Sequence, residues 1–84
     1  MEVSSMEVTV KLFATLRDFL PKNSDGKSCR VEIDENTTIK QIITQLKLPE
    51  EIPKIILVNG LNGSIDQTLK DGDVLSIFPP VAGG

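Results

Sequence analysis

Apolar and polar residues alternate in residues 6–13, 28–34 and 74–78, which is the pattern of strands with one buried face. The residues expected to face the core are Val8, Val10, Leu12, Cys29, Val31, Ile33, Leu75 and Ile77. Phe13 and Phe78 have the opposite parity, so both rings are expected on the outer face of the sheet. An exposed apolar patch of this kind often marks a protein partner, unless a loop covers Phe13 or a bulge shifts the parity.

A different spacing of apolar residues predicts two helices. Residues 38–48 carry an apolar stripe at helical spacing, and Thr38 with Gln41 matches a capping box. The stripe consists of Ile39, Ile42, Ile43 and Leu46. Residues 14–20 predict a short helix of about two turns, which Pro21 ends.

Turn signals separate the remaining elements. Residues 54–63 predict a strand with a tight turn at Asn59-Gly60, because a two-residue hairpin turn needs positive φ at both positions. Asp71-Gly72 predicts another turn before the last strand. The order of elements indicates an α+β domain with a mixed four- to five-stranded sheet packed on one main helix. This order fits the ubiquitin-like β-grasp layout, in which the first and last strands run parallel in the centre of the sheet.

The composition excludes several classes of function. The 84 residues make one domain, and the net charge of −3 argues against nucleic acid and favours docking onto a basic protein surface. The chain has no histidine, which is the usual general base and the commonest metal ligand, so no metal site is expected. Cys29 has no second cysteine to pair with, which favours a reducing, cytoplasmic location. No apolar run approaches the roughly 18 residues that span a bilayer, so no membrane partner is expected.

Three features suggest local chemistry, and a structural role is favoured for each. Two acidic pairs have no basic partner at a telling spacing, so they are expected to be solvated surface or turn residues. These pairs are Glu50-Glu51 and Asp71-x-Asp73. Cys29 would suit a nucleophile or a sulfur relay, but it shares strand parity with core residues. Gly60-x-x-Gly63 lacks the Lys-Ser/Thr pair and the helix of a phosphate-binding loop.

Residues 79–84 (PPVAGG) make an unusual ending for a strand. Pro79 and Pro80 lack an N–H and fix φ, so they are expected to end the sheet and direct the chain outward. A narrow tip follows, suited to entering a tunnel in another protein. The tip consists of Val81, Ala82, Gly83 and Gly84. Its reactive group would be the Gly84 carboxylate, which becomes a good electrophile when it is activated as an acyl-adenylate.

These features resemble the small subunit of molybdopterin synthase, a ubiquitin-like sulfur carrier of the type that also serves thiamine synthesis. The resemblance covers nearly the whole chain from Met6. It is strongest in KLFATLRD (11–18), TIKQII (38–43), VNG (58–60) and LKDGDVLSIFPPVAGG (69–84). A terminal Gly-Gly alone is a weak signal, whereas the DGD turn, the alternating strand, FPP and Gly-Gly together are specific.

The resemblance implies a carrier that is not catalytic on its own and that binds no cofactor. A ubiquitin-activating-type adenylating enzyme would use ATP to activate Gly84, and a sulfurtransferase or cysteine desulfurase would supply sulfur for a thiocarboxylate. Residues 79–84 would then enter the large subunit of molybdopterin synthase, which holds the active site. The residues that would pack on partners are Phe13, Leu61 and Phe78.

Other functions stay open at this point. The chain would also suit a sulfur carrier for thiamine, cysteine or tungsten-cofactor synthesis, a ubiquitin-like protein modifier, or a binding domain with an inert tail. FPPVAGG favours the molybdopterin branch over the thiamine branch. In each case the expected division is a flexible extension (1–5), a β-grasp domain (6–78) and an extended tail (79–84).

Overall fold

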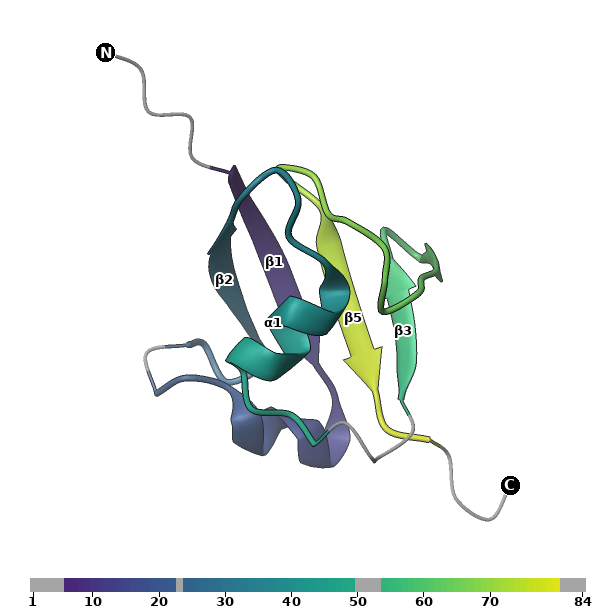
Figure 1. The fold of residues 1–84 in the computed structure, drawn as a ribbon. Coiled ribbons are helices and arrows are strands. Elements are labelled where there is room, and N and C mark those ends of the chain that lie inside the picture. The colour runs from purple at the N-terminus through teal and green to yellow at the C-terminus, as the bar shows by residue number, and fades with distance from the viewer. Residues whose placement is uncertain (1–5, 23, 50–53, 81–84) are drawn as a thin grey trace.

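The computed structural model describes residues 6–22, 24–49 and 54–80. Five strands form one sheet, with a short 3₁₀ helix and an α-helix between strands in the chain (Figure 1). The elements are β1 (Met6–Leu12), η1 (Ala14–Phe19), β2 (Ser28–Ile33), α1 (Ile39–Gln45), β3 (Ile55–Val58), β4 (Leu61–Asn62) and β5 (Val74–Phe78). Met6 begins the first strand and Phe78 ends the last. The proposed division into extension, domain and tail stays a prediction, because residues 1–5 and 81–84 lie outside the described residues.

The sheet has the order β2-β1-β5-β3-β4, and β1 and β5 run parallel at its centre. The other neighbouring pairs, β1 with β2, β3 with β5 and β3 with β4, are antiparallel. Figure 1 shows α1 crossing one face of this sheet, while η1 lies at the end where β1 finishes. The mixed five-stranded β-grasp layout is therefore confirmed. Among the described residues only α1 is an α-helix, so the opposite face of the sheet, the helix-free face, carries no described α-helix.

The core lies between α1 and the sheet. Its buried residues are Val8, Val10, Leu12, Leu16, Val31, Ile33, Ile39, Ile42, Ile43, Leu48, Val58, Leu69, Leu75 and Ile77. The predicted inward parity holds in all three alternating strands, and Cys29 shares the inward face with its partner Val10. Cys29 is half-buried at the margin of this core, because β2 is an edge strand and its side chains are covered from fewer sides.

Helix α1 has the predicted start and an earlier end than predicted. The Thr38 hydroxyl accepts the Gln41 N–H at 3.3 Å, and the Gln41 side chain accepts the Thr38 N–H at 2.9 Å, which is a complete capping box. The helix ends at Gln45 because Lys47 adopts φ +62°, and the N–H of Leu48 then bonds back to the Ile43 carbonyl at 3.0 Å. This ending normally uses glycine, so the sequence carried no signal for it.

The predicted short helix over residues 14–20 is a 3₁₀ helix rather than an α-helix. It begins at Ala14, whose φ is +55°, directly after Phe13, whose backbone is extended. The Phe13 side chain makes no capping hydrogen bond to this helix, and Leu16 is the helix residue that is buried in the core. With one buried anchor and no cap, the segment keeps the tighter three-residue turn used for short connections.

The two predicted turns are confirmed. Asn59 and Gly60 have φ of +53° and +86°, as the tight hairpin between β3 and β4 requires. Asn59 also links this turn to β5, since its side chain accepts the Val74 N–H at 2.9 Å and donates to Asp73 at 3.0 Å. Gly72 supplies the second turn with φ +87°. No helix among the described residues is long and apolar enough to cross a membrane.

Candidate functional site

Phe13 and Phe78 meet on the helix-free face, at the end of the sheet where β1 and β5 finish. The Phe13 N–H donates to the Ile77 carbonyl at 3.2 Å, which continues the parallel pairing of the two strands by one residue. Each side chain points away from α1, since the neighbouring Leu12 and Ile77 are fully buried beneath the helix. The two rings are stacked, with centroids 4.1 Å apart and planes 11° from parallel. The predicted position of both aromatics is therefore confirmed.

An apolar groove of about 540 Å³ opens around this aromatic pair. It is lined by Phe13, Ala14, Ile55, Leu57, Phe78, Pro79 and Pro80. The contribution of β3 follows from the register, in which Ile55 is the partner of Phe78. Ile55 is exposed and the two aromatics are half-buried, so the groove presents a continuous apolar surface to solvent.

The sequence interpretation missed Ile55, Leu57 and Ala14 as members of this groove. A signal for the first two was present, because residues 55–58 (IILV) are apolar at all four positions. An unbroken apolar run means that both faces of a strand carry apolar side chains. Ala14 gave no such signal, since its position depends on the left-handed backbone that follows β1.

The groove leads to the proposed tail. Phe78 is the last residue of β5, and Pro79 and Pro80 lie at the rim of the groove. Neither proline can donate to the sheet, which explains why the strand ends here. The remaining tail residues Val81, Ala82, Gly83 and Gly84 lie outside the described residues, so their roles stay predictions.

Leu61 does not line the groove. It pairs with Val58 across the hairpin, and Val58 is buried on the side of the sheet that α1 covers. Directly paired residues share a face, so the register assigns Leu61 to the side opposite Phe13 and Phe78. Leu61 is nevertheless 73% exposed, and its predicted role as a partner contact remains a prediction about a separate surface.

The acidic and glycine candidates have structural roles where the structure describes them. Asp71 accepts the Glu7 N–H at 2.8 Å, and Asp73 accepts the Lys70 N–H at 2.8 Å, so both carboxylates hold turns. Glu50-Glu51 lies outside the described residues. A Cβ at Gly63 would lie 2.9 Å from a methyl group of Val58, so this glycine permits close packing of the hairpin.

The half-buried Cys29 is poorly suited to nucleophilic chemistry. Burial raises the pKa of its thiol, and the Asp25 carboxylate raises it further. The reactive form of a cysteine is the thiolate, which a raised pKa disfavours. Cys29 therefore acts as a small apolar residue at the edge of the core.

Asp25 organises the loop beside the groove. Its carboxylate accepts the N–H groups of Lys27 at 2.8 Å and Ser28 at 2.7 Å, and these bonds lower its pKa below the ordinary 3.8. The ionised carboxylate thereby fixes the start of β2 next to Lys11 and Phe13. Asp25, Lys11 and Phe13 all line a second hollow, which is smaller than the groove.

This arrangement predicts a pH-dependent contribution of Asp25 to stability. A lowered pKa in the folded state means that the contribution is complete above the unfolded pKa and is lost as pH falls through the folded pKa. Asp25→Ala is expected to be less stable than the wild-type chain at about pH 6 and nearly equal to it at about pH 2. Urea unfolding at both pH values measures this, with the exposed carboxylate variant Asp18→Ala as the control. A difference that stays constant with pH would contradict the assignment.

Comparisons with known proteins agree with this fold. A profile of the family described as Mut7-C ubiquitin matches residues 5–83. Small archaeal modifier protein 3 of Haloferax volcanii is 31% identical, and the match covers 94% of this chain and 100% of that protein.

Two solved structures extend the comparison. A putative molybdopterin converting factor, subunit 1, from Pyrococcus furiosus matches with a TM-score of 0.71 and 30% identity, covering 90% of this chain and 99% of that chain. The protein-protein complex of subunits 1 and 2 of the molybdopterin-converting factor from Helicobacter pylori contains a chain that matches with a TM-score of 0.54 and 28% identity. That match covers 94% of this chain and 100% of the other. The fold is thus shared with ubiquitin-like proteins, one of which was solved together with a partner subunit.

Proposed function

Because this chain belongs to the Mut7-C ubiquitin family and is homologous to a small archaeal modifier protein, we propose that it is a sulfur carrier whose terminal glycine is loaded with sulfur. The observation that supports this proposal is the apolar groove beside Pro79 and Pro80, which joins a docking surface to the start of the Gly-Gly tail. The protein would contribute a reactive terminus and a docking face. Partner enzymes would contribute the catalysis, and no cofactor would bind to the carrier itself.

The proposed chemistry takes place at Gly84 in three steps. In the first, the carboxylate attacks the α-phosphorus of ATP on a ubiquitin-activating-type enzyme, which gives an acyl-adenylate and releases pyrophosphate. In the second, a persulfide sulfur from a sulfurtransferase or cysteine desulfurase attacks the carbonyl carbon and displaces AMP. A thiol reductant then cleaves the sulfur–sulfur bond and leaves a thiocarboxylate on Gly84. Because the reaction consumes ATP, we propose a cytoplasmic location for it.

The first candidate destination for this sulfur is the precursor of molybdopterin. The similarity to a molybdopterin converting factor subunit supports it, as does the FPPVAGG ending that the sequence shares with that branch by resemblance. In this function residues 79–84 would enter the active site of the large synthase subunit. Thiamine, cysteine and tungsten-cofactor synthesis are further sulfur-carrier destinations.

The second candidate is conjugation to proteins, which the 31% identity to a small archaeal modifier protein favours. Here the lysine amine of a target would attack the carbonyl carbon of the Gly84 acyl-adenylate and displace AMP, and loss of a proton from the amine would leave an isopeptide bond. Trypsin cleaves after Lys70, so a modified lysine would carry residues 71–84 as a recognisable remnant.

Intact-mass measurement tests the shared step. The chain is incubated with the adenylating enzyme of its own genome, ATP and a sulfur source. We expect its mass to rise by the difference between sulfur and oxygen, in an ATP-dependent manner. An unchanged mass under conditions where the enzyme is active on another carrier would refute the proposal. Formation of molybdopterin with a large synthase subunit, or recovery of the 71–84 remnant on lysines, then separates the two candidates.

Substituting Phe78 tests the docking face. Phe78→Asp places a charge in the groove in place of a stacked ring. We therefore expect the affinity for the adenylating enzyme to fall about 30-fold, which is the loss typical of substituting a central interface residue. Because Phe78 is half-buried, stability is expected to fall by only about 1 kcal/mol, the value of an aromatic pair.

Ile65→Asp is the matched control for this substitution. Ile65 is an exposed apolar residue outside the groove, and its replacement is expected to change the dissociation constant by no more than about twofold, as for a residue outside the interface core. Equal losses in the two variants would extend the docking face beyond the groove. A large loss of stability in Phe78→Asp would instead show that the ring serves the core.

A further inference from the structure

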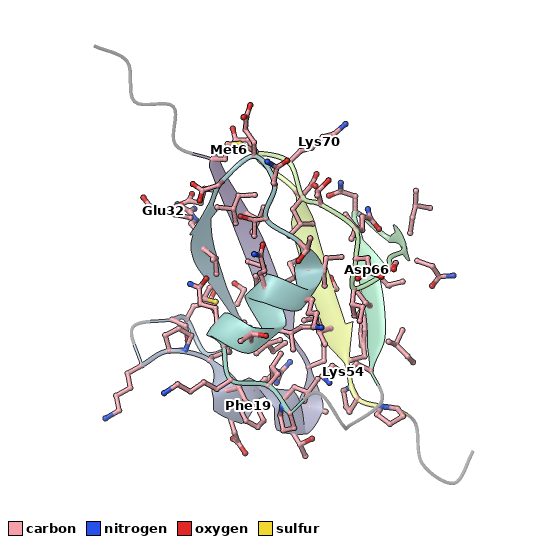
Figure 2. The ribbon with its side chains drawn as sticks, in the orientation of Figure 1. Met6, Phe19, Glu32, Lys54, Asp66 and Lys70 are labelled. Atoms are coloured by element: carbon pink, nitrogen blue, oxygen red, sulfur yellow. The ribbon has the colours of Figure 1, made fainter. Side chains whose placement is uncertain are left out.

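The charges on the helix-free face are unevenly distributed along the strands. At the end where β1 begins, Glu7 and Glu32 are directly paired on this face, and Asp71 holds the adjacent turn. Figure 2 shows Glu32 and Lys70 near this end and Lys54 near the opposite end, where the groove lies. The net charge of −3 therefore does not describe the surface around Phe13 and Phe78.

A cationic hollow of about 300 Å³ adjoins the apolar groove, and Phe13 is a wall of both. Its lining is Lys11, Leu12, Phe13, Arg17, Asp25, Lys27 and Ser28. Lys11 lies two residues before Phe13, so both side chains project from the same face of the sheet. Arg17 is positioned by a hydrogen bond from its Nε to the Leu12 carbonyl at 3.3 Å.

The hollow has a positive balance. Three cations, Lys11, Arg17 and Lys27, face one carboxylate, Asp25, and three minus one leaves a charge of +2. The Asp25 carboxylate accepts hydrogen bonds from the backbone N–H groups of Lys27 and Ser28, so it interacts with the loop backbone as well as with the cations. Lys11 and Lys27 are exposed, and their charges are available to a molecule that docks on the groove.

We propose that the protein partner of this face presents an apolar side chain flanked by carboxylates, with the apolar group in the groove and the carboxylates against Lys11, Arg17 and Lys27. This inference deepens the proposed function and rests on its docking face. It reverses the expectation of a basic partner surface, which used only the net charge. Opposite charges at the rim accelerate association, while Glu7 and Glu32 would repel the same partner at the far end. The two ends together would fix the orientation in which the partner docks.

A peptide series tests the partner chemistry independently of sulfur loading. Three peptides of equal length carry a central Leu-Phe pair flanked by Glu, Gln or Lys, and each is titrated into the isotope-labelled full chain at an ionic strength of about 0.02 M, where screening is weak. We expect the Glu peptide to bind about tenfold more tightly than the Lys peptide, with chemical-shift changes at Phe13, Ala14 and Leu57. The difference should shrink at about 0.3 M salt.

Two double variants of equal net charge provide the control. Lys11→Glu with Lys27→Glu is expected to reverse the order of the Glu and Lys peptides. Lys40→Glu with Lys70→Glu, which changes exposed lysines on α1 and in the turn before β5, is expected to keep it. Equal affinities for all three peptides, no binding, shift changes outside the groove, or the same response in both variants would overturn the proposal. A failure of sulfur loading with the expected peptide order would refute the proposed function alone.

Discussion

Deletion of Gly84 is expected to abolish thiocarboxylate formation while the domain stays folded. The proposed electrophile is the carbonyl of the terminal glycine, and removal of this residue leaves Gly83 one residue short of the adenylating site. A displacement of even about 1 Å can cost a hundredfold in rate when reacting atoms must be aligned, and one residue spans more than about 3 Å. The measurement is intact mass after incubation with the adenylating enzyme, ATP and a sulfur source.

Two further chains make this prediction specific. An added alanine after Gly84 is expected to block loading to the same degree, because the terminal carboxylate then lies beyond the site. Val81→Ala keeps the terminal Gly-Gly and is expected to be loaded. The three chains should unfold at the same urea concentration as the wild-type chain, since the elements of the described fold end at or before Phe78. Full loading of the shortened chain would contradict the assignment of Gly84.

Leu75→Ala is expected to cause the largest loss of stability among simple truncations of the sheet. Leu75 has no exposed surface and lies in β5, where it pairs with Val10 on one side and Val58 on the other. Removal of a buried leucine side chain costs roughly 2–5 kcal/mol, because both its burial and the packing of its neighbours are lost. Small domains are stable by only about 5–15 kcal/mol, so this variant is expected to lose a large share of its folding free energy.

Urea unfolding measures this effect, and Leu61→Ala is its control. The control makes the same chemical change at a leucine that is 73% exposed, and a surface substitution is expected to shift stability by no more than about 0.5 kcal/mol. Similar values for the two variants would show that Leu75 is not part of a rigid core. Loading of Leu75→Ala at low temperature would separate its structural role from any role in docking.

The difference between net and local charge is the reason why the proposed partner differs from the one expected from composition. Glu7, Glu32 and Asp71 lie at one end of the helix-free face, whereas Lys11 and Lys27 lie at the other. Electrostatic attraction between proteins acts over about 8 Å at physiological salt, which is shorter than a five-residue strand. A docking partner therefore senses the charges nearest the groove, and the total of −3 has little influence on it.

Much of the fold followed from the sequence because its signals are local. Alternation in β1 and β5 assigned the inward residues, Thr38 with Gln41 marked the start of α1, and Asn59-Gly60 marked the hairpin. The end of α1 was missed because Lys47, rather than glycine, adopts the left-handed backbone there. In that position the bonds from the following N–H groups and the burial of Leu48 offset the strain of a side chain at positive φ.

By itself, the sequence determined the α+β class, the inward faces of the strands and the Gly-Gly ending on which the proposed chemistry depends. Only the tertiary structure decided that Phe13 and Phe78 stack, that Ile55 and Leu57 complete their groove, and that Leu61 lies on the other side. It also decided which charges surround the groove, since Lys11, Arg17 and Lys27 come from three separate segments. Periodicity reports which way a side chain points within its own strand, whereas contact between strands depends on register and order, which are set when the whole core packs.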